Sequence, residues 1–161
     1  MNLSIKETED GFNVWSPEEG GFGINCLEDK VTLWKEECNF DEEFGDRCKP
    51  QMIEGATSLG SLLILLKHVD GQQKLYEEGI EGGLDLSQKN FEECGRYCVE
   101  FDKYSTIIHY KDENDLSKSF YGEKNPGLQC IYDIEEIEKP IRVIEVALTL
   151  GREKWGKEWM I

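Results

Sequence analysis

The chain has 161 residues, of which 34 are acidic and 18 are basic, so its formal net charge at pH 7 is −16. This length suits one domain that can bury a core, and we expect a single globular domain over residues 1–161. Aromatic residues make up 11%, too many for a disordered chain of high charge. The charge argues against direct binding to nucleic acid or to an anionic membrane, because both repel an acidic protein.

The acidic excess is uneven along the sequence. Residues 1–50 hold 13 acidic and 5 basic side chains, whereas residues 51–105 hold 10 and 5, and residues 106–161 hold 11 and 8. A negative field attracts basic partners and speeds their association. The alternative, that the charge serves solubility alone, stays open at this point.

The N-terminus gives no sign of export. Met1 to Thr8 contain Glu7 and lack the apolar region of a signal peptide. The longest apolar run, Leu62 to Leu66, is too short to span a bilayer. We therefore expect a cytoplasmic protein without a membrane segment, in which the six cysteines are reduced thiols. Disulfides, metal binding and the oligomeric state stay open.

The first third of the chain has the pattern of strands. Apolar residues alternate on both sides of Asp10-Gly11, which predicts a hairpin. Two more strands are expected in residues 22–27 and 31–34, giving an antiparallel meander over residues 2–36. Residues 36–56 break this alternation and predict a long loop or a short irregular helix.

The remaining elements are expected in mixed order. Ser58 to Val69 predict a helix that ends at Asp70-Gly71, and Glu77 to Asp85 predict a loop. A second helix is expected from Ser87, because Phe91, Cys94, Tyr97 or Cys98, and Phe101 recur at helical spacing. Strands are expected at 106–110 and 128–134, with a polar loop at 111–127.

Pro140 fits the first turn of a C-terminal helix, although an extended segment over 141–150 is an alternative. These elements together predict an α+β fold, with an antiparallel N-terminal meander and two or three helices packed on the sheet.

Metal ligands are considered first among the chemical possibilities. Cys94 and Cys98 are four residues apart on the predicted helix and would share one face, which makes them zinc candidates. The chain has no Cys-x-x-Cys pair, and two free cysteines at this spacing are expected to pack as small apolar residues. The carboxylates of residues 41–46 lack the order of a calcium-binding loop. No metal and no cofactor is predicted.

Catalysis has little support in the sequence. A Cys94–His109 pair is conceivable, but no motif surrounds it. The glycine-rich segments 19–23 and 79–83 carry glutamate and lack the Lys-Ser/Thr of a phosphate-binding loop. No catalytic residue is predicted, although a small zinc-dependent enzyme or domain that uses Cys and His ligands remains an alternative function.

Binding to a protein is the favoured hypothesis. The densest acidic stretch contains two phenylalanines four residues apart, and protein interfaces combine aromatic anchors with charge at the rim. A closing turn of the domain would explain these aromatics equally well. The predicted partner-binding residues are Glu36, Glu37, Phe40, Asp41, Glu42, Glu43, Phe44 and Asp46.

A small, acidic, motif-poor chain with many aromatic residues is similar in type to toxin-neutralising immunity proteins and to phage-encoded nuclease inhibitors, with which it shares no motif. Nucleases are basic because their substrate is a polyanion, so an acidic inhibitor associates with them quickly. The sequence thus predicts a non-enzymatic inhibitor or immunity-type protein that neutralises a basic partner such as a nuclease or toxin. A viral or complex-assembly subunit is a further alternative.

Overall fold

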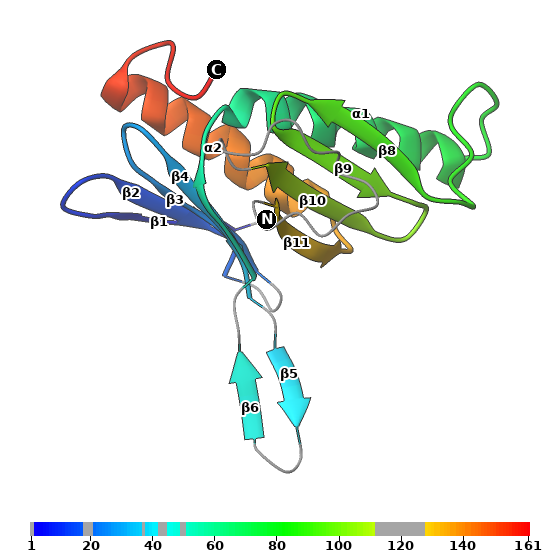
Figure 1. The fold of residues 1–161 in the computed structure, drawn as a ribbon, viewed down its shortest axis with the longest axis horizontal. Coiled ribbons are helices and arrows are strands. Elements are labelled where there is room, and N and C mark those ends of the chain that lie inside the picture. Colours follow the sequence, from blue (N-terminus) through cyan, green and yellow to red (C-terminus); the bar gives the residue numbers. More distant parts are fainter. Residues whose placement is uncertain (1, 18–20, 37, 42–44, 49–50, 112–127) are drawn as a thin grey trace.

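The computed structural model describes residues 2–17, 21–36, 38–41, 45–48, 51–111 and 128–161, with 38–41 and 45–48 described by their backbone alone (Figure 1). These ranges contain strands and two helices. In chain order, the elements are β1 (Ser4–Glu7), β2 (Phe12–Trp15), β3 (Phe22–Cys26), β4 (Val31–Lys35), β5 (Cys38–Asp41), β6 (Gly45–Cys48), β7 (Gln51–Ala56), α1 (Leu59–Glu77), β8 (Asn90–Cys94), β9 (Tyr97–Phe101), β10 (Thr106–Lys111), β11 (Leu128–Ile134) and α2 (Glu138–Trp155).

The strands form two large antiparallel sheets and a separate hairpin. The first sheet has the order β1-β2-β3-β4-β7 and the second has the order β11-β10-β9-β8, while β5 and β6 form a two-stranded sheet. The expected hairpin at Asp10-Gly11 is confirmed, since Ile5 pairs with Val14 and the N–H of Thr8 donates to the carbonyl of Gly11 at 2.9 Å. The α+β class is therefore confirmed, but one N-terminal meander does not account for the fold, because a second sheet follows it.

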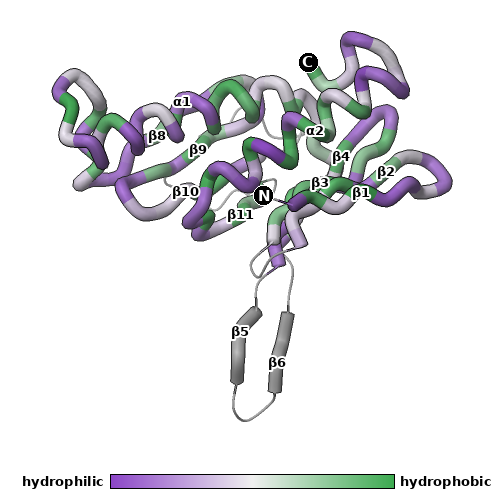
Figure 2. Tube along the Cα trace, turned by 180° about the vertical axis from the view of Figure 1, so that it is seen from behind, coloured by the Kyte–Doolittle hydropathy of each residue, from purple (hydrophilic) through white to green (hydrophobic). Residues whose placement is uncertain are grey.

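The two helices exchange sheets. Helix α1 follows the first sheet in sequence but packs on β8 and β9 of the second, whereas α2 follows the second sheet and packs on β2 and β3 of the first. The helices also contact one another, and Figure 1 shows them side by side. Viewed from behind, α2 alternates between hydrophilic and hydrophobic residues, as expected for a helix with one buried face (Figure 2). The buried residues of both halves form one hydrophobic cluster.

Glutamine side chains join the two sheets where their edges meet. The side-chain amide of Gln129 on β11 accepts from the N–H of Glu54 on β7 at 2.7 Å and donates to the carbonyl of Glu54 at 3.3 Å. The N–H of Tyr132 donates to Oε1 of Gln51 at 2.6 Å. An edge strand leaves backbone groups unpaired, and these amides satisfy some of them without a continuous backbone ladder.

The helix expected from Ser87 to Phe101 is wrong. This segment forms the hairpin β8–β9, and the turn between Cys94 and Tyr97 contains Gly95 at φ 59°. Glycine adopts a positive φ without steric cost. A residue with a positive φ interrupts a helix, but it fits a tight hairpin turn. The residues that seemed helical instead alternate in β9, where Tyr97, Val99 and Phe101 are buried in the core.

Two boundaries also differ from the expectation. The segment expected to be irregular, 36–56, contains β5, β6 and β7 in its described part. Helix α1 runs past Asp70-Gly71 to Glu77, because one exposed helical glycine costs only about 1 kcal/mol. The carboxylate of Asp70 also accepts from Lys74 Nζ at 3.0 Å, which supports the helix across that glycine.

The elements expected near the C-terminus are confirmed where the structure describes them. Strands β10 and β11 match the predicted 106–110 and 128–134, and the predicted loop at 111–127 lies outside the described residues except for Lys111 in β10. Residues 141–150 are helical, so the extended alternative is wrong.

The C-terminal tail folds back onto the first sheet. The rings of Trp155 and Trp159 lie 5.1 Å apart between centroids, and Trp155 stacks on Phe12 at 5.5 Å. The indole N–H of Trp159 donates to the carbonyls of Leu27 and Glu28 at 3.1 and 3.0 Å. These two tryptophans therefore anchor the tail to the core.

Candidate functional site

The predicted partner-binding residues centre on the hairpin β5–β6. Phe40 and Asp46 are register partners, and Asp41 is opposite Gly45. Figure 1 shows this hairpin extending away from the two large sheets. Glu36, which precedes it, is exposed, and its N–H donates to the carbonyl of Gly21 at 2.9 Å.

The remaining predicted contact residues are not described: Glu37, Glu42, Glu43 and Phe44 lie outside the described residues. Of Phe40, Asp41 and Asp46, only the backbone is described. The described backbone thus brings Phe40 and Asp46 to opposite positions on one hairpin, and the role of the whole stretch in binding stays a prediction.

The zinc candidates Cys94 and Cys98 do not share a face. Cys94 is opposite Tyr97 and therefore faces the core with it, whereas Cys98 is the next residue along β9 and faces the other side of the sheet. The two cysteines lie on the neighbouring strands β8 and β9 and not, as the sequence predicted, on one helix. In the described parts of the chain, no three His, Cys, Asp or Glu side chains form a group able to hold a metal ion.

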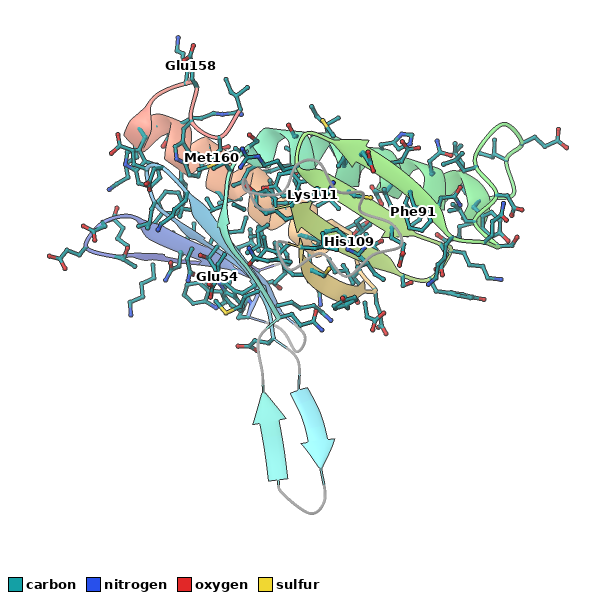
Figure 3. All side chains as sticks on the ribbon, viewed as in Figure 1. Glu54, Phe91, His109, Lys111, Glu158 and Met160 are labelled. Carbon is teal, nitrogen blue, oxygen red and sulfur yellow. The ribbon has the colours of Figure 1, made fainter. Side chains whose placement is uncertain are left out.

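The side of the second sheet that faces away from the helices carries a row of polar side chains that sequence reasoning missed. His109 on β10 is the register partner of Cys98 on β9 and of Cys130 on β11. Its Nδ1 lies 3.0 Å from Sγ of Cys130. Figure 3 labels His109 on this sheet, together with Phe91 and Lys111. The sheet thus forms a Cys–His pair, but with Cys130 rather than with Cys94, which lies on β8 and faces the core.

The environment of this pair favours the neutral form of both side chains. Burial raises the pKa of the Cys130 thiol, and burial lowers the pKa of His109 more than the nearby carboxylate of Glu100 raises it. A hydrogen bond to Cys130, with smaller contributions from its charge and from burial, raises the pKa of Tyr132 to about 12. A nucleophilic cysteine needs a depressed pKa and a protonated neighbour, so this pair has the character of a structural hydrogen bond.

The sequence pattern of β10 and β11 could have indicated part of the His109–Cys130 arrangement. Residues 106–110 and 128–134 were expected to be strands, and alternation assigns His109 and Cys130 each to one face. The register between the strands was not accessible, because a shift of one residue would have placed Cys130 opposite a different neighbour.

The second histidine, His68, takes no part in this row. It lies on α1, and its Nε2 is 3.4 Å from the carboxylate of Glu92 on the helix-facing side of β8. The two imidazoles therefore belong to opposite sides of the second sheet and do not form a common site.

Comparison of the chain with protein-family models, with curated proteins and with solved structures gives no match in any of the three. Neither α1 nor α2, the helices of the described ranges, combines the length and the apolar character needed to cross a membrane.

Proposed function

We propose that this chain is a non-enzymatic acidic binding protein that neutralises a basic partner, such as a nuclease or toxin, by covering its surface. The observation that carries the proposal is the acidic excess, −16 in total, with 13 acidic against 5 basic residues in the first 50. A nuclease is basic where it holds its polyanionic substrate, and an acidic protein that occupies that surface competes with the substrate.

The described ion pairs leave the N-terminal carboxylates available for a partner. The carboxylates that form ion pairs with other described residues all lie in the part of the sequence from Asp70 to Glu145. The described acidic residues of the first sheet and its turns are all exposed and have no ion-pair partner within the described ranges: Glu7, Glu9, Asp10, Glu28, Asp29, Glu36 and Glu54. Their charge therefore contributes to the field that an approaching partner meets.

The arrangement of β5 and β6 supports a contact at the acidic stretch. A hairpin that extends from the body can enter a concave surface of a partner, and it carries the acidic residues closest to Phe40 in sequence. Aromatic residues at the centre of an interface contribute most of its binding energy, while surrounding charges accelerate association.

The test begins with capture of a binding protein on the immobilised chain from an extract of the source organism, followed by its identification and purification. We expect a basic protein that forms a 1:1 complex by light scattering and loses its activity as one equivalent of the chain is added. A captured protein that is acidic, or that keeps its full activity in the saturated complex, would contradict the proposal.

The alternative of a zinc-dependent enzyme or domain has the weaker support. Its strongest observation is the His109–Cys130 pair at 3.0 Å, and the described residues add no third ligand to it. Stoichiometric zinc in the purified chain that is lost on replacing Cys130 with serine would favour this alternative over the binding function. No described feature favours an assembly subunit.

A further inference from the structure

Three apolar side chains are exposed at the end of α1 and on the segment that follows it. The exposed fractions are 38% for Tyr76, 49% for Ile80 and 37% for Leu84. The segment lies at the end of the second sheet where α1 ends and β8 begins, on the right of Figure 1. We call Tyr76, Ile80 and Leu84, with the carboxylates among and beside them (Glu77, Glu78, Glu81 and Asp85), the loop surface.

The backbone beneath the loop surface is fixed by hydrogen bonds. The N–H of Ile80 donates to the carbonyl of Leu75 at 3.0 Å, and the N–H of Leu84 donates to Oε1 of Gln72 at 2.9 Å. Leu86, two residues farther on, is completely buried and ties the loop to the core. Side chains presented from a fixed backbone lose less freedom on binding than those of a loose loop, so they suit a contact with a partner.

The loop surface carries negative charge only. All four carboxylates are exposed, and no Lys or Arg lies between Leu75 and Gln88. The flanking Lys74 is paired with Asp70 at 3.0 Å and with Glu138 at 3.8 Å. The other flanking base, Lys89, lies 3.9 Å from Glu100. Apolar side chains that alternate along the segment with carboxylates, and with no base among them, have the composition of an interface centre with a charged rim.

We propose that the loop surface binds a basic protein partner, and that Ile80 and Leu84 contact an apolar residue surrounded by Lys and Arg on that partner. This assignment rests on the proposed function. It adds a second contact with the partner to the one proposed at the acidic hairpin, β5–β6. A second copy of this chain is a poor occupant, because a symmetric pairing would bring the same four carboxylates against one another. An anionic membrane would repel them in the same way.

A random peptide library displayed on phage provides a defined probe. We expect selection on the wild-type chain to enrich peptides that combine Lys or Arg with an apolar residue. Replacing Ile80 and Leu84 together (Ile80→Ser with Leu84→Ser) should weaken the binding of these peptides by about tenfold or more. Both positions are exposed, so the variant is expected to keep the wild-type melting temperature, which circular dichroism checks.

Ile5→Ser is the matched control, because Ile5 is 53% exposed on β1, in the other sheet. The control should bind the selected peptides as tightly as the wild type does. Failure to enrich basic peptides, or equal affinity of the double variant and the wild type, would overturn the assignment. If the partner captured in the test of the proposed function binds the double variant as tightly as the wild type, the assignment of the loop surface is wrong and the proposed function stands. If the peptides map to the loop surface but the captured protein keeps its activity in the saturated complex, the loop surface stands and the function is wrong.

Discussion

Nδ1 of His109 and Sγ of Cys130 lie 3.0 Å apart on neighbouring strands, and burial opposes a charge on either side chain. Such a pair resembles a catalytic dyad in distance alone. A dyad acts as a nucleophile when its thiol is ionised and its imidazole protonated, and both pKa shifts work against that state. The pair therefore stabilises the contact between β10 and β11.

The reactivity of Cys130 follows from this relationship. Because burial raises the thiol pKa, Cys130 should react with iodoacetamide at pH 7.5 more slowly in the folded chain than in the chain unfolded by guanidinium. Mass spectrometry of the Cys130 peptide at successive times measures both rates. Faster alkylation in the folded chain would contradict a neutral thiol and would favour the enzyme alternative.

The stability of the chain should depend on the protonation of His109. Burial lowers the pKa of His109 below its ordinary value of 6.5, so the unfolded chain takes up this proton at a higher pH than the folded chain does. The free energy of unfolding should therefore fall as the pH is lowered through 6.5 towards the folded pKa. Glu100 faces His109 and reduces this effect, and Cys130 is its neutral neighbour.

Urea unfolding at a series of pH values from about 8 to about 5.5 measures this dependence. The variant His109→Asn should lose the part of the slope that His109 contributes, whatever its absolute stability. An unchanged slope in the variant would show that the imidazole is equally easy to protonate in both states.

Two helical glycines offer a matched pair of substitutions. A Cβ at Gly151 on α2 would overlap ring carbons of Trp159, so Gly151→Ala should destabilise the fold by roughly 2 kcal/mol. A Cβ at Gly71 on α1 meets nothing within 4 Å, so Gly71→Ala should stabilise the fold by about 1 kcal/mol. Chemical denaturation of both variants checks the signs. A stable Gly151→Ala variant would mean that the Trp159 ring does not pack tightly on α2.

The strands of the first sheet could be predicted because they alternate and are separated by short turns. Phe12 and Val14 are buried while Asn13 lies between them, and the same pattern recurs in β4. The helix predicted over residues 87–101 was wrong for a physical reason. Apolar residues recur there at helical spacing by coincidence: Phe91, Cys94, Cys98 and Phe101. The positive φ of Gly95 and the burial of Tyr97 and Val99 in a common core decided the outcome.

The candidate sites show the same division. The acidic excess and its location are properties of composition, so they were accessible from the sequence. The partner of His109 depends on strand register, and the exposure of Ile80 and Leu84 depends on how the loop after α1 is held by Gln72 and Leu75. Two apolar residues in a glycine-rich acidic loop were the signal that could have indicated the loop surface.

Charge reversal in the acidic hairpin β5–β6 should slow association with the partner more than charge reversal in another acidic segment does. Replacing Asp41, Glu42 and Asp46 with lysine should slow association with the captured partner by roughly tenfold, because the steering field reverses at the contact. The same number of reversals at Glu135, Glu136 and Glu138 is the control and should have a smaller effect. Stopped-flow or surface-based kinetics measures both rates. Equal effects would show that only the total charge matters.

The most direct test of the central claim is the association rate constant of the chain with its captured partner, measured as a function of ionic strength. Raising the salt from about 0.01 M to about 1 M shortens the Debye length from roughly 30 Å to roughly 3 Å. If the acidic excess steers a basic partner, the association rate should fall by at least about tenfold across this range, while the dissociation rate changes much less. An association rate that is independent of salt would contradict the account.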